Sequence, residues 1–249
     1  MSQSVETSSA AAVCRWIVTG WRDYRRCWWI SSAYSTIFVL FGGGVIGLLV
    51  HAELYPILYP MLTGFMLVAP VAVIGFFRVA EILHTGGQPQ FRDFLHGFRQ
   101  APPGIWGIAL LLGFGFLIWI TDALLLYVMY FDVGALPLDR VLVELPVGRV
   151  GAFLLFATII GFVLALAIFA VSAFSLPLLF NRRRTLVPAV VTSVKTVFEH
   201  PLLMACWAAC LVVMAFFALF VFLPALVVIL PVLAFAGYQG YRDLFDVDR

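Results

Sequence analysis

The amino-acid sequence predicts an all-α membrane protein with six transmembrane helices, arranged as three helical hairpins with amphipathic interfacial helices on the cytoplasmic side. Composition is the first observation behind this fold class. Of the 249 residues, 63% are hydrophobic and only 11% are charged, a balance that suits side chains facing lipid. The second observation is a series of long apolar runs separated by short polar connections. The third is the unequal distribution of arginine and lysine between alternate connections.

The three hairpins are expected to be weakly similar repeats of one unit. In the clearest copy, Phe91–Trp119, a short basic amphipathic stretch is followed by a proline-rich break and an apolar run. We place the repeats at about 11–83, 91–180 and 187–245 within a single six-helix membrane domain, 11–249. Shared membrane composition is the alternative explanation, and internal repeats occur in many membrane proteins, so the pattern selects no function.

The chain does not begin with the pattern of a cleaved signal peptide. Residues 1–10 are mostly polar and are expected to form a disordered tail, and Arg15 interrupts the next apolar stretch. Over 11–30, four arginines lie among four tryptophans, a combination typical of a helix lying in the membrane interface. We expect the first of three interfacial helices here and the others to begin near Phe91 and Val191.

Two spans form the first predicted hairpin. The first is expected at about Ser32–Val50 and the second at about Ile57–Phe77, with the polar turn His51–Pro56 between them. Just past the second span, Arg78 and Glu81 are three residues apart. Their side chains can therefore form an ion pair on one helical face.

The other two hairpins follow from the remaining apolar runs. The third span is expected at about Gly104–Tyr130 and the fourth at about Val150–Phe180, joined by the connection 131–149. The range Pro201–Gly240 contains no charged residue. As one helix it would measure roughly 60 Å, about two bilayer cores. It must therefore turn back near Phe222–Pro224, which gives the fifth and sixth spans.

Charge distribution predicts the orientation. Thirteen of the 15 lysines and arginines lie on the side that holds 1–31, 78–103, 181–200 and 241–249. The positive-inside rule therefore places both termini in the cytoplasm. One short sequence also occurs on this side near both ends of the chain, as GWRD at 20–23 and GYRD at 240–243.

Asp122 is the main candidate for transport chemistry, because an acid within a span is expensive and often functional. Its place toward the outer end of the third span also fits an interfacial role without function. Pro70, Pro177 and Pro231 recur in the even-numbered spans. Broken helices line substrate sites in some transporters, although such prolines are also ordinary packing kinks.

Basic residues on the cytoplasmic segments are candidates for binding anionic lipid headgroups, because they lie among aromatic residues. They are Arg22, Arg25, Arg26, Arg92, Arg99, Arg182, Arg183 and Arg184. Subunits of a membrane complex, or further copies of this chain, could use the same surface. A net charge of +2 gives no reason to expect nucleic acid.

The sequence contains no recognisable catalytic constellation. A nucleophile elbow, a zinc-protease motif and a dinucleotide loop are all missing. The four histidines do not share a helix at metal-ligand spacing, and two of the four cysteines, Cys206 and Cys210, read as small packing residues. We therefore expect no catalytic residue, no metal and no cofactor.

Four segments resemble a family of bacterial, mostly proteobacterial, integral membrane proteins catalogued as a domain of unknown function. They are FRDFLHGFRQAPPGIWGIAL, SLPLLFNR, AVVTSVKTVFEHPLLMACWA and LPVLAFAGYQGYRDL. The resemblance implies a multi-pass protein of the inner membrane but no activity. Some members are labelled as cytochrome c oxidase components. This sequence lacks the intramembrane histidines of a haem–copper catalytic subunit, so that label would imply an accessory or assembly role.

The leading hypothesis is a non-enzymatic accessory or scaffolding protein of the inner membrane. A transporter or channel for small solutes or ions, using Asp122 and the proline-kinked helices, is the alternative. A lipid-interacting envelope protein is a further alternative.

Overall fold

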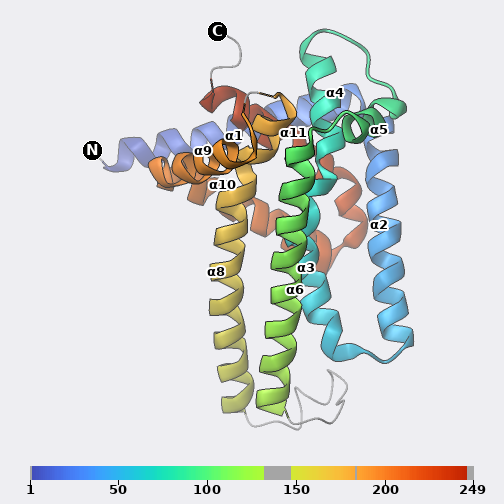
Figure 1. Cartoon of the computed structure of the whole chain (residues 1–249), viewed down its shortest axis with the longest axis vertical. Helices are drawn as coiled ribbons and strands as arrows, with labels where there is room; N and C mark the ends of the chain where they lie inside the picture. The colour runs from blue at the N-terminus through green and yellow to red at the C-terminus, as the bar shows by residue number, and fades with distance from the viewer. Residues whose placement is uncertain (1, 132–146, 183, 246–249) are drawn as a thin grey trace. The chain divides into compact units, whose positions relative to one another are not determined.

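The structure, a computed structural model, describes residues 2–131, 147–182 and 184–245, which are almost entirely helical and contain no strand (Figure 1). The predicted all-α class is therefore confirmed. The helices are α1 (Ser2–Arg26), α2 (Trp28–His51), α3 (Tyr55–Ala72), α4 (Ile74–His84), α5 (Phe91–Arg99), α6 (Pro103–Phe131), α8 (Val147–Phe180), α9 (Leu186–Glu199), α10 (Pro201–Phe216) and α11 (Leu226–Leu244). A π-helical turn, Phe217–Val221, and a 3₁₀ turn, Leu223–Ala225, connect α10 to α11.

Five helices in the described part of the chain are long and apolar enough to cross a membrane. They are Trp28–His51, Pro103–Tyr130, Gly148–Phe180, Pro201–Val221 and Leu223–Leu244. Each coincides with an expected span, and the turn expected near Phe222 separates the last two. The remaining span, expected as one helix over Ile57–Phe77, is divided between α3 and α4 by a turn at Val73. At the N-terminus, α1 begins at Ser2, ahead of the helix expected from residue 11.

The chain forms two compact units. The first comprises Met1–Leu40, Pro70–Ile108 and Ala170–Arg249, and the second comprises Phe41–Ala69 and Ala109–Phe169. Each unit is described separately below.

The first unit is built on close packing between α1 and α11. A Cβ added to Gly20 of α1 would lie only 2.6 Å from the Val232 carbonyl oxygen and 2.8 Å from the Ala236 nitrogen. Trp16, one turn earlier, is 2% exposed, and a Cβ at Gly240 of α11 would lie 3.0 Å from its ring. Small residues at both positions therefore allow the two helices to approach closely, as small residues do at other helix interfaces.

Aromatic rings attach α5 to the same unit. Phe94, the fully buried residue of α5, stacks on Tyr34 of α2 with ring centroids 4.4 Å apart and meets Phe76 of α4 edge-on at 5.2 Å. Phe76 also contacts Phe235 of α11 edge-on. A capping box formed by Gln90 and Asp93 begins α5. The amphipathic helix is thus fixed to the unit by its buried face.

A serine joins α9 to α8. The Ser193 hydroxyl accepts a hydrogen bond from the Phe174 N–H (3.1 Å) and donates to the Ala170 carbonyl oxygen (2.7 Å). An α-helix would pair these two backbone groups with each other. Ser193 therefore bridges the backbone ladder of α8 one turn before Pro177, which lies inside that helix.

In the second unit, α6 and α8 run side by side and α3 packs against them (Figure 1). Trp119 of α6 is the central side chain, because its indole N–H donates to the Pro60 carbonyl oxygen and to the Thr63 hydroxyl, both at 3.0 Å. Its ring lies against Gly64 of α3 and Gly161 of α8, where a Cβ would come within 3.0 Å. Many other large side chains of this unit, including Leu110, Phe114 and Phe162, are exposed, as lipid-facing residues would be.

Replacing Gly20 with alanine should destabilise the protein. The added methyl group would meet backbone atoms of α11 that cannot move aside, and overpacking of this kind costs about 1–3 kcal/mol. We expect a lower melting temperature for Gly20→Ala in detergent. Gly42→Ala is the matched control, because nothing lies within 4 Å of the Cβ that it adds. Equal melting temperatures for the two variants would contradict the close approach of α1 and α11.

Candidate functional site

Asp23 is the only charged side chain that is buried among the residues whose burial the structure describes, with 6% of its surface exposed. It lies near the end of α1. His84, the last residue of α4, places its Nε2 atom 3.7 Å from the Asp23 carboxylate. Arg26 of α1 and Arg242 of α11 also act on this carboxylate electrostatically. Asp23 is therefore a point at which three helices meet.

Burial sets the electrostatics of Asp23. Loss of water raises the pKa of its carboxyl group above the ordinary value of 3.8, and the positive charges of Arg26 and Arg242 act in the opposite direction. The buried charge is thus partly offset by cations from both ends of the chain.

A second carboxylate stabilises the same end of the unit. Asp243 of α11 accepts a hydrogen bond from the Trp16 indole N–H at 2.7 Å and another from the Gln239 amide at 2.8 Å. The His84 ring stacks on Tyr238 of α11, with centroids 6.3 Å apart. These contacts and the Asp23 pair form what we call the polar cluster: Trp16, Asp23, His84, Gln239, Arg242 and Asp243, of which Trp16 and Asp23 are buried.

Cys27 borders this cluster without adding a nucleophile to it. Its thiol donates to the Asp23 carbonyl oxygen at 3.3 Å and lies 3.2 Å from the Ser31 hydroxyl. Burial raises the pKa of Cys27 to about 11, and the negative charge of Asp23 acts in the same direction. Because the thiolate is the reactive form, this cysteine is inert at neutral pH.

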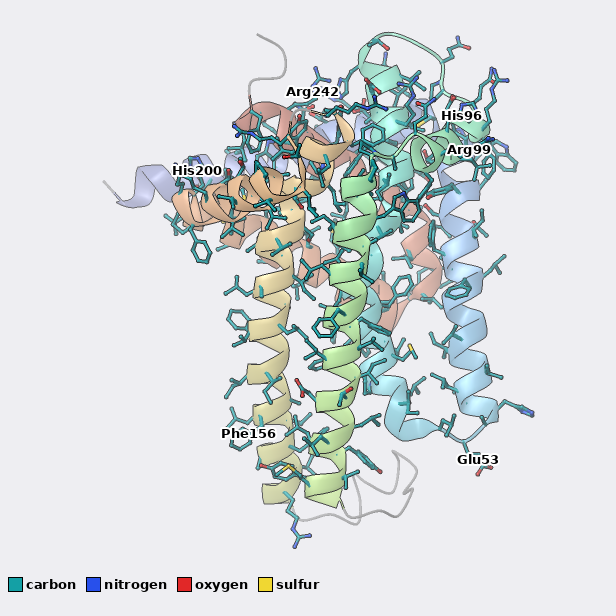
Figure 2. The ribbon with its side chains drawn as sticks, in the orientation of Figure 1. Glu53, His96, Arg99, Phe156, His200 and Arg242 are labelled. Atoms are coloured by element: carbon teal, nitrogen blue, oxygen red, sulfur yellow. The ribbon has the colours of Figure 1, made fainter. Side chains whose placement is uncertain are left out.

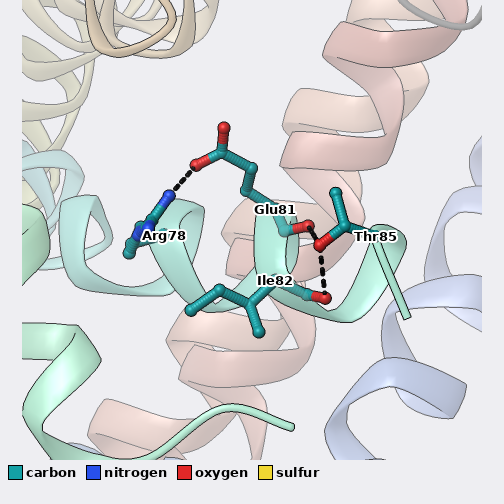
Figure 3. A network of polar contacts seen from close by, with 4 residues as sticks. All are labelled: Arg78, Glu81, Ile82 and Thr85. Atoms are coloured by element: carbon teal, nitrogen blue, oxygen red, sulfur yellow. Dashed lines mark hydrogen bonds and ion pairs between the residues drawn. The ribbon is translucent and has the colours of Figure 1, made fainter. Parts of the chain in front are cut away.

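The end of α4 is fixed by local polar contacts (Figure 3). The Arg78 guanidinium and the Glu81 carboxylate lie 2.6 Å apart, which confirms the ion pair predicted from their spacing. The Thr85 hydroxyl donates to the carbonyl oxygens of Glu81 and Ile82. Both contacts stabilise the last turn of α4, which positions His84 toward Asp23.

The polar cluster suits cohesion better than chemistry. It joins α1, α4 and α11 through side chains that contact one another. In the described parts of the chain, no group of three or more histidine, cysteine, aspartate or glutamate side chains could hold a metal ion.

The candidate transport residues are divided between the two units. Asp122 is partly exposed on α6 in the second unit, and its neighbour Thr121 donates to the Leu117 carbonyl oxygen at 2.8 Å. Pro70, Pro177 and Pro231 belong to the first unit, where Pro177 and Pro231 are buried. A transport role for these four residues stays a prediction.

The candidate lipid-binding arginines are exposed wherever the structure describes them. They are Arg22, Arg25, Arg26, Arg92, Arg99, Arg182 and Arg184, whereas Arg183 lies outside the described residues. On α5 the exposed apolar side chains of Phe91 and Leu95 accompany Arg92 and Arg99. Figure 2 shows Arg99 and His96 on this helix. Such a mixture suits a helix at the membrane surface.

Sequence reasoning missed the burial of Asp23 and its pairing with His84. Within the run RDYRR, Asp23 reads as one charge on a solvated face. The signal that could have revealed it is the GWRD sequence repeated as GYRD. In the structure Gly20 packs against α11, and Gly240 packs against Trp16 of α1. The glycines that begin the two similar sequences thus both lie in the contact between α1 and α11.

Comparison with known proteins gives membrane residence and no activity. Residues 58–181 match the model of a family described as predicted integral membrane protein (DUF2189). No curated protein and no solved structure matches the chain significantly. Of the residues of the polar cluster, only His84 lies within the matched segment.

Replacing Asp23 with asparagine should change how stability depends on pH. Because burial raises the pKa of Asp23, the folded protein holds this proton more tightly than the unfolded chain, so ionisation reduces folding stability as the pH rises above 3.8. Asparagine cannot ionise. The melting temperature of Asp23→Asn, relative to that of the wild type, should therefore increase over a pH series that starts below 3.8.

Glu199→Gln is the matched control for this measurement, because that carboxylate is exposed and pairs only with Lys195 at the surface. The relative melting temperature of Asp23→Asn could instead fall as the pH rises. That result would mean that Arg26 and Arg242 outweigh burial, and it would contradict the stated direction.

Proposed function

Since residues 58–181 belong to the DUF2189 family of predicted integral membrane proteins, we propose that this chain is a non-enzymatic accessory or scaffolding protein of the bacterial inner membrane. It crosses the bilayer six times, as three hairpins, and both of its termini are cytoplasmic. It needs no cofactor. Its partners are the lipid bilayer and the subunits of a membrane complex, or further copies of itself.

The contact between the two ends of the chain carries the proposed topology. Trp16 precedes the first candidate span, and Asp243 lies at the end of the last, yet their side chains are hydrogen-bonded at 2.7 Å. Two groups in such contact lie on the same side of a bilayer. The number of crossings between them is therefore even.

This condition favours six crossings over five. Five uninterrupted helices would leave Trp16 and Asp243 on opposite faces. The segment formed by α3 and α4, Tyr55–His84, supplies the missing crossing, because the 18 residues of its first helix include no charged side chain and α4 follows after a single turn residue, Val73. The charge distribution then assigns the shared side of the ends to the cytoplasm.

A scaffolding role is supported by how the polar side chains are used. Trp119 holds α6 to α3, Ser193 holds α9 to α8, and Asp243 holds α11 to α1. Each of these groups hydrogen-bonds within the protein instead of facing a substrate. What remains exposed is an extensive apolar surface together with basic and aromatic interfacial helices, which are surfaces for lipid and for other membrane proteins.

Cysteine accessibility tests the topology. In an otherwise cysteine-free chain, we expect Cys14, or a cysteine added after Arg249, to react with a membrane-impermeant maleimide only in inside-out vesicles. Cys14 is exposed in the structure. Ala52→Cys, in the exposed turn that also contains Glu53 (Figure 2), should react only in spheroplasts. Reaction of the two chain ends from opposite sides would rule out an even number of crossings.

Co-purification tests the accessory role. We expect the tagged full-length chain, extracted in mild detergent from native membranes, to retain a membrane protein or further copies of itself at a constant ratio. Mixing with isotope-labelled membranes from an untagged strain separates native partners from those acquired after extraction. A chain recovered alone as a monomer would contradict the role. Solute flux in proteoliposomes that is lost in Asp122→Asn would instead establish a transporter.

A further inference from the structure

The first unit contains an open pocket of about 580 Å³ beside the polar cluster. One wall is the junction between α1 and α2, from Arg26 to Ile30. The opposite wall is the end of α4 with the loop that follows it, including Leu83 and Gly86–Pro89. The pocket thus lies where the N-terminal helix gives way to the first candidate span, Trp28–His51.

The loop wall is held in place by its own backbone. The Gly86 N–H donates to the Leu83 carbonyl oxygen at 3.2 Å, and the Gly87 N–H donates to the Ile82 carbonyl oxygen at 2.9 Å. Gly86 has a φ of 77°, a conformation that favours glycine. At Gly87 an added Cβ would lie 2.8 Å from the Ile82 side chain. These contacts therefore fix the course of the loop that forms this wall.

The residues that line the pocket include a cation, a neutral amide and an apolar side chain. Arg26 contributes a guanidinium group, which forms strong, geometrically defined hydrogen bonds to phosphate oxygens. Gln88 contributes an amide from the facing wall, and the buried Leu83 contributes hydrocarbon. None of the lining residues is acidic. This chemistry suits a ligand that carries phosphate next to a less polar part.

The position of the pocket indicates the source of the phosphate. Trp28 and Trp29 line it, are 56% and 69% exposed, and are the first two residues of a candidate span. Tryptophans at such positions lie at the depth of lipid headgroups. A phosphate held by Arg26, two residues before the span, is at the level where phospholipids carry theirs. Phospholipid headgroups are always present at this depth of a bilayer, which favours a lipid over a soluble phosphate as the ligand.

We propose that this pocket binds the headgroup of an anionic phospholipid, with Arg26 contacting the phosphate and the two tryptophans packing against the glycerol and the upper acyl chains. The inference rests on the proposed function, because it requires Trp28 to lie at the membrane boundary. It replaces the general expectation that many exposed arginines bind lipid headgroups with one defined binding site at Arg26.

Native mass spectrometry of the full-length protein in detergent tests the site. Phosphatidylglycerol and phosphatidylcholine with the same acyl chains are titrated separately. We expect the wild type to prefer phosphatidylglycerol, and Arg26→Gln to weaken its binding about fivefold, the effect of losing one cation near an anionic lipid. Arg25→Gln is the matched control, because Arg25 is an exposed neighbour that does not line the pocket. It should change binding less than Arg26→Gln.

Gln88→Ala provides a second variant on the loop wall, outside any helix, in case Arg26→Gln disturbs folding. It should also weaken binding of phosphatidylglycerol. Equal losses in the Arg25 and Arg26 variants, or no loss in either pocket variant, would overturn the site in favour of a diffuse basic surface. Competition by free glycerol 3-phosphate as effective as that by the lipid would mean a pocket for a soluble anion, and would also overturn it.

The topology measurement separates this inference from the function on which it rests. Cysteine accessibility depends on which side each chain end occupies and not on lipid affinity. Chain ends on one side together with no selective lipid binding would refute the pocket alone. Chain ends on opposite sides would refute the membrane placement that the pocket requires.

Discussion

The packing of the first helix against the last is the constraint on which the rest of the first unit depends. Gly20 and Gly240 remove the side chains that would keep α1 and α11 apart, and the contact of Trp16 with Asp243 closes the gap at one end. Once these helices are together, α11 presents Phe235 to the aromatic cluster and Arg242 to Asp23. The pair then holds α4 through Phe235 and Asp23, and α5 packs in turn on Phe76 of α4.

The position of a single buried acid explains why the polar contacts are concentrated at this junction. A carboxylate removed from water is unfavourable unless cations or donors surround it. Asp23 receives His84 from α4 and the field of Arg242 from α11. The arrangement makes α1 intolerant of alternative registers, because a shift by one residue would move the acid away from both. Burial of charge thus adds to the specificity that the close approach of Gly20 to α11 already provides.

Features that depend on composition and periodicity could be predicted from the sequence. Features that depend on a single backbone turn or on a pair of residues far apart in the chain could not. Apolar runs identified five spans within a few residues, and helical spacing identified the pair Arg78 and Glu81. Because hydropathy measures how apolar a segment is and not its backbone geometry, it could not predict the turn at Val73. Asp23 looked like one charge among several, because its partner His84 lies 61 residues away and shares no local pattern with it. The role of Asp122 stays undecided for the same reason, since spacing cannot identify what it contacts.

Contact between the two ends also imposes an order on biosynthesis. The residues that form the hydrogen bond from Trp16 to Asp243 are 227 positions apart. At ribosomal rates of about 5–20 residues per second, roughly 11–45 seconds separate their emergence. For that interval the N-terminal helix is complete, but α11, the helix against which it packs, is not. Its arginines and tryptophans allow it to bind the bilayer surface during this time. It can then pack against the last span once the insertion machinery releases that span.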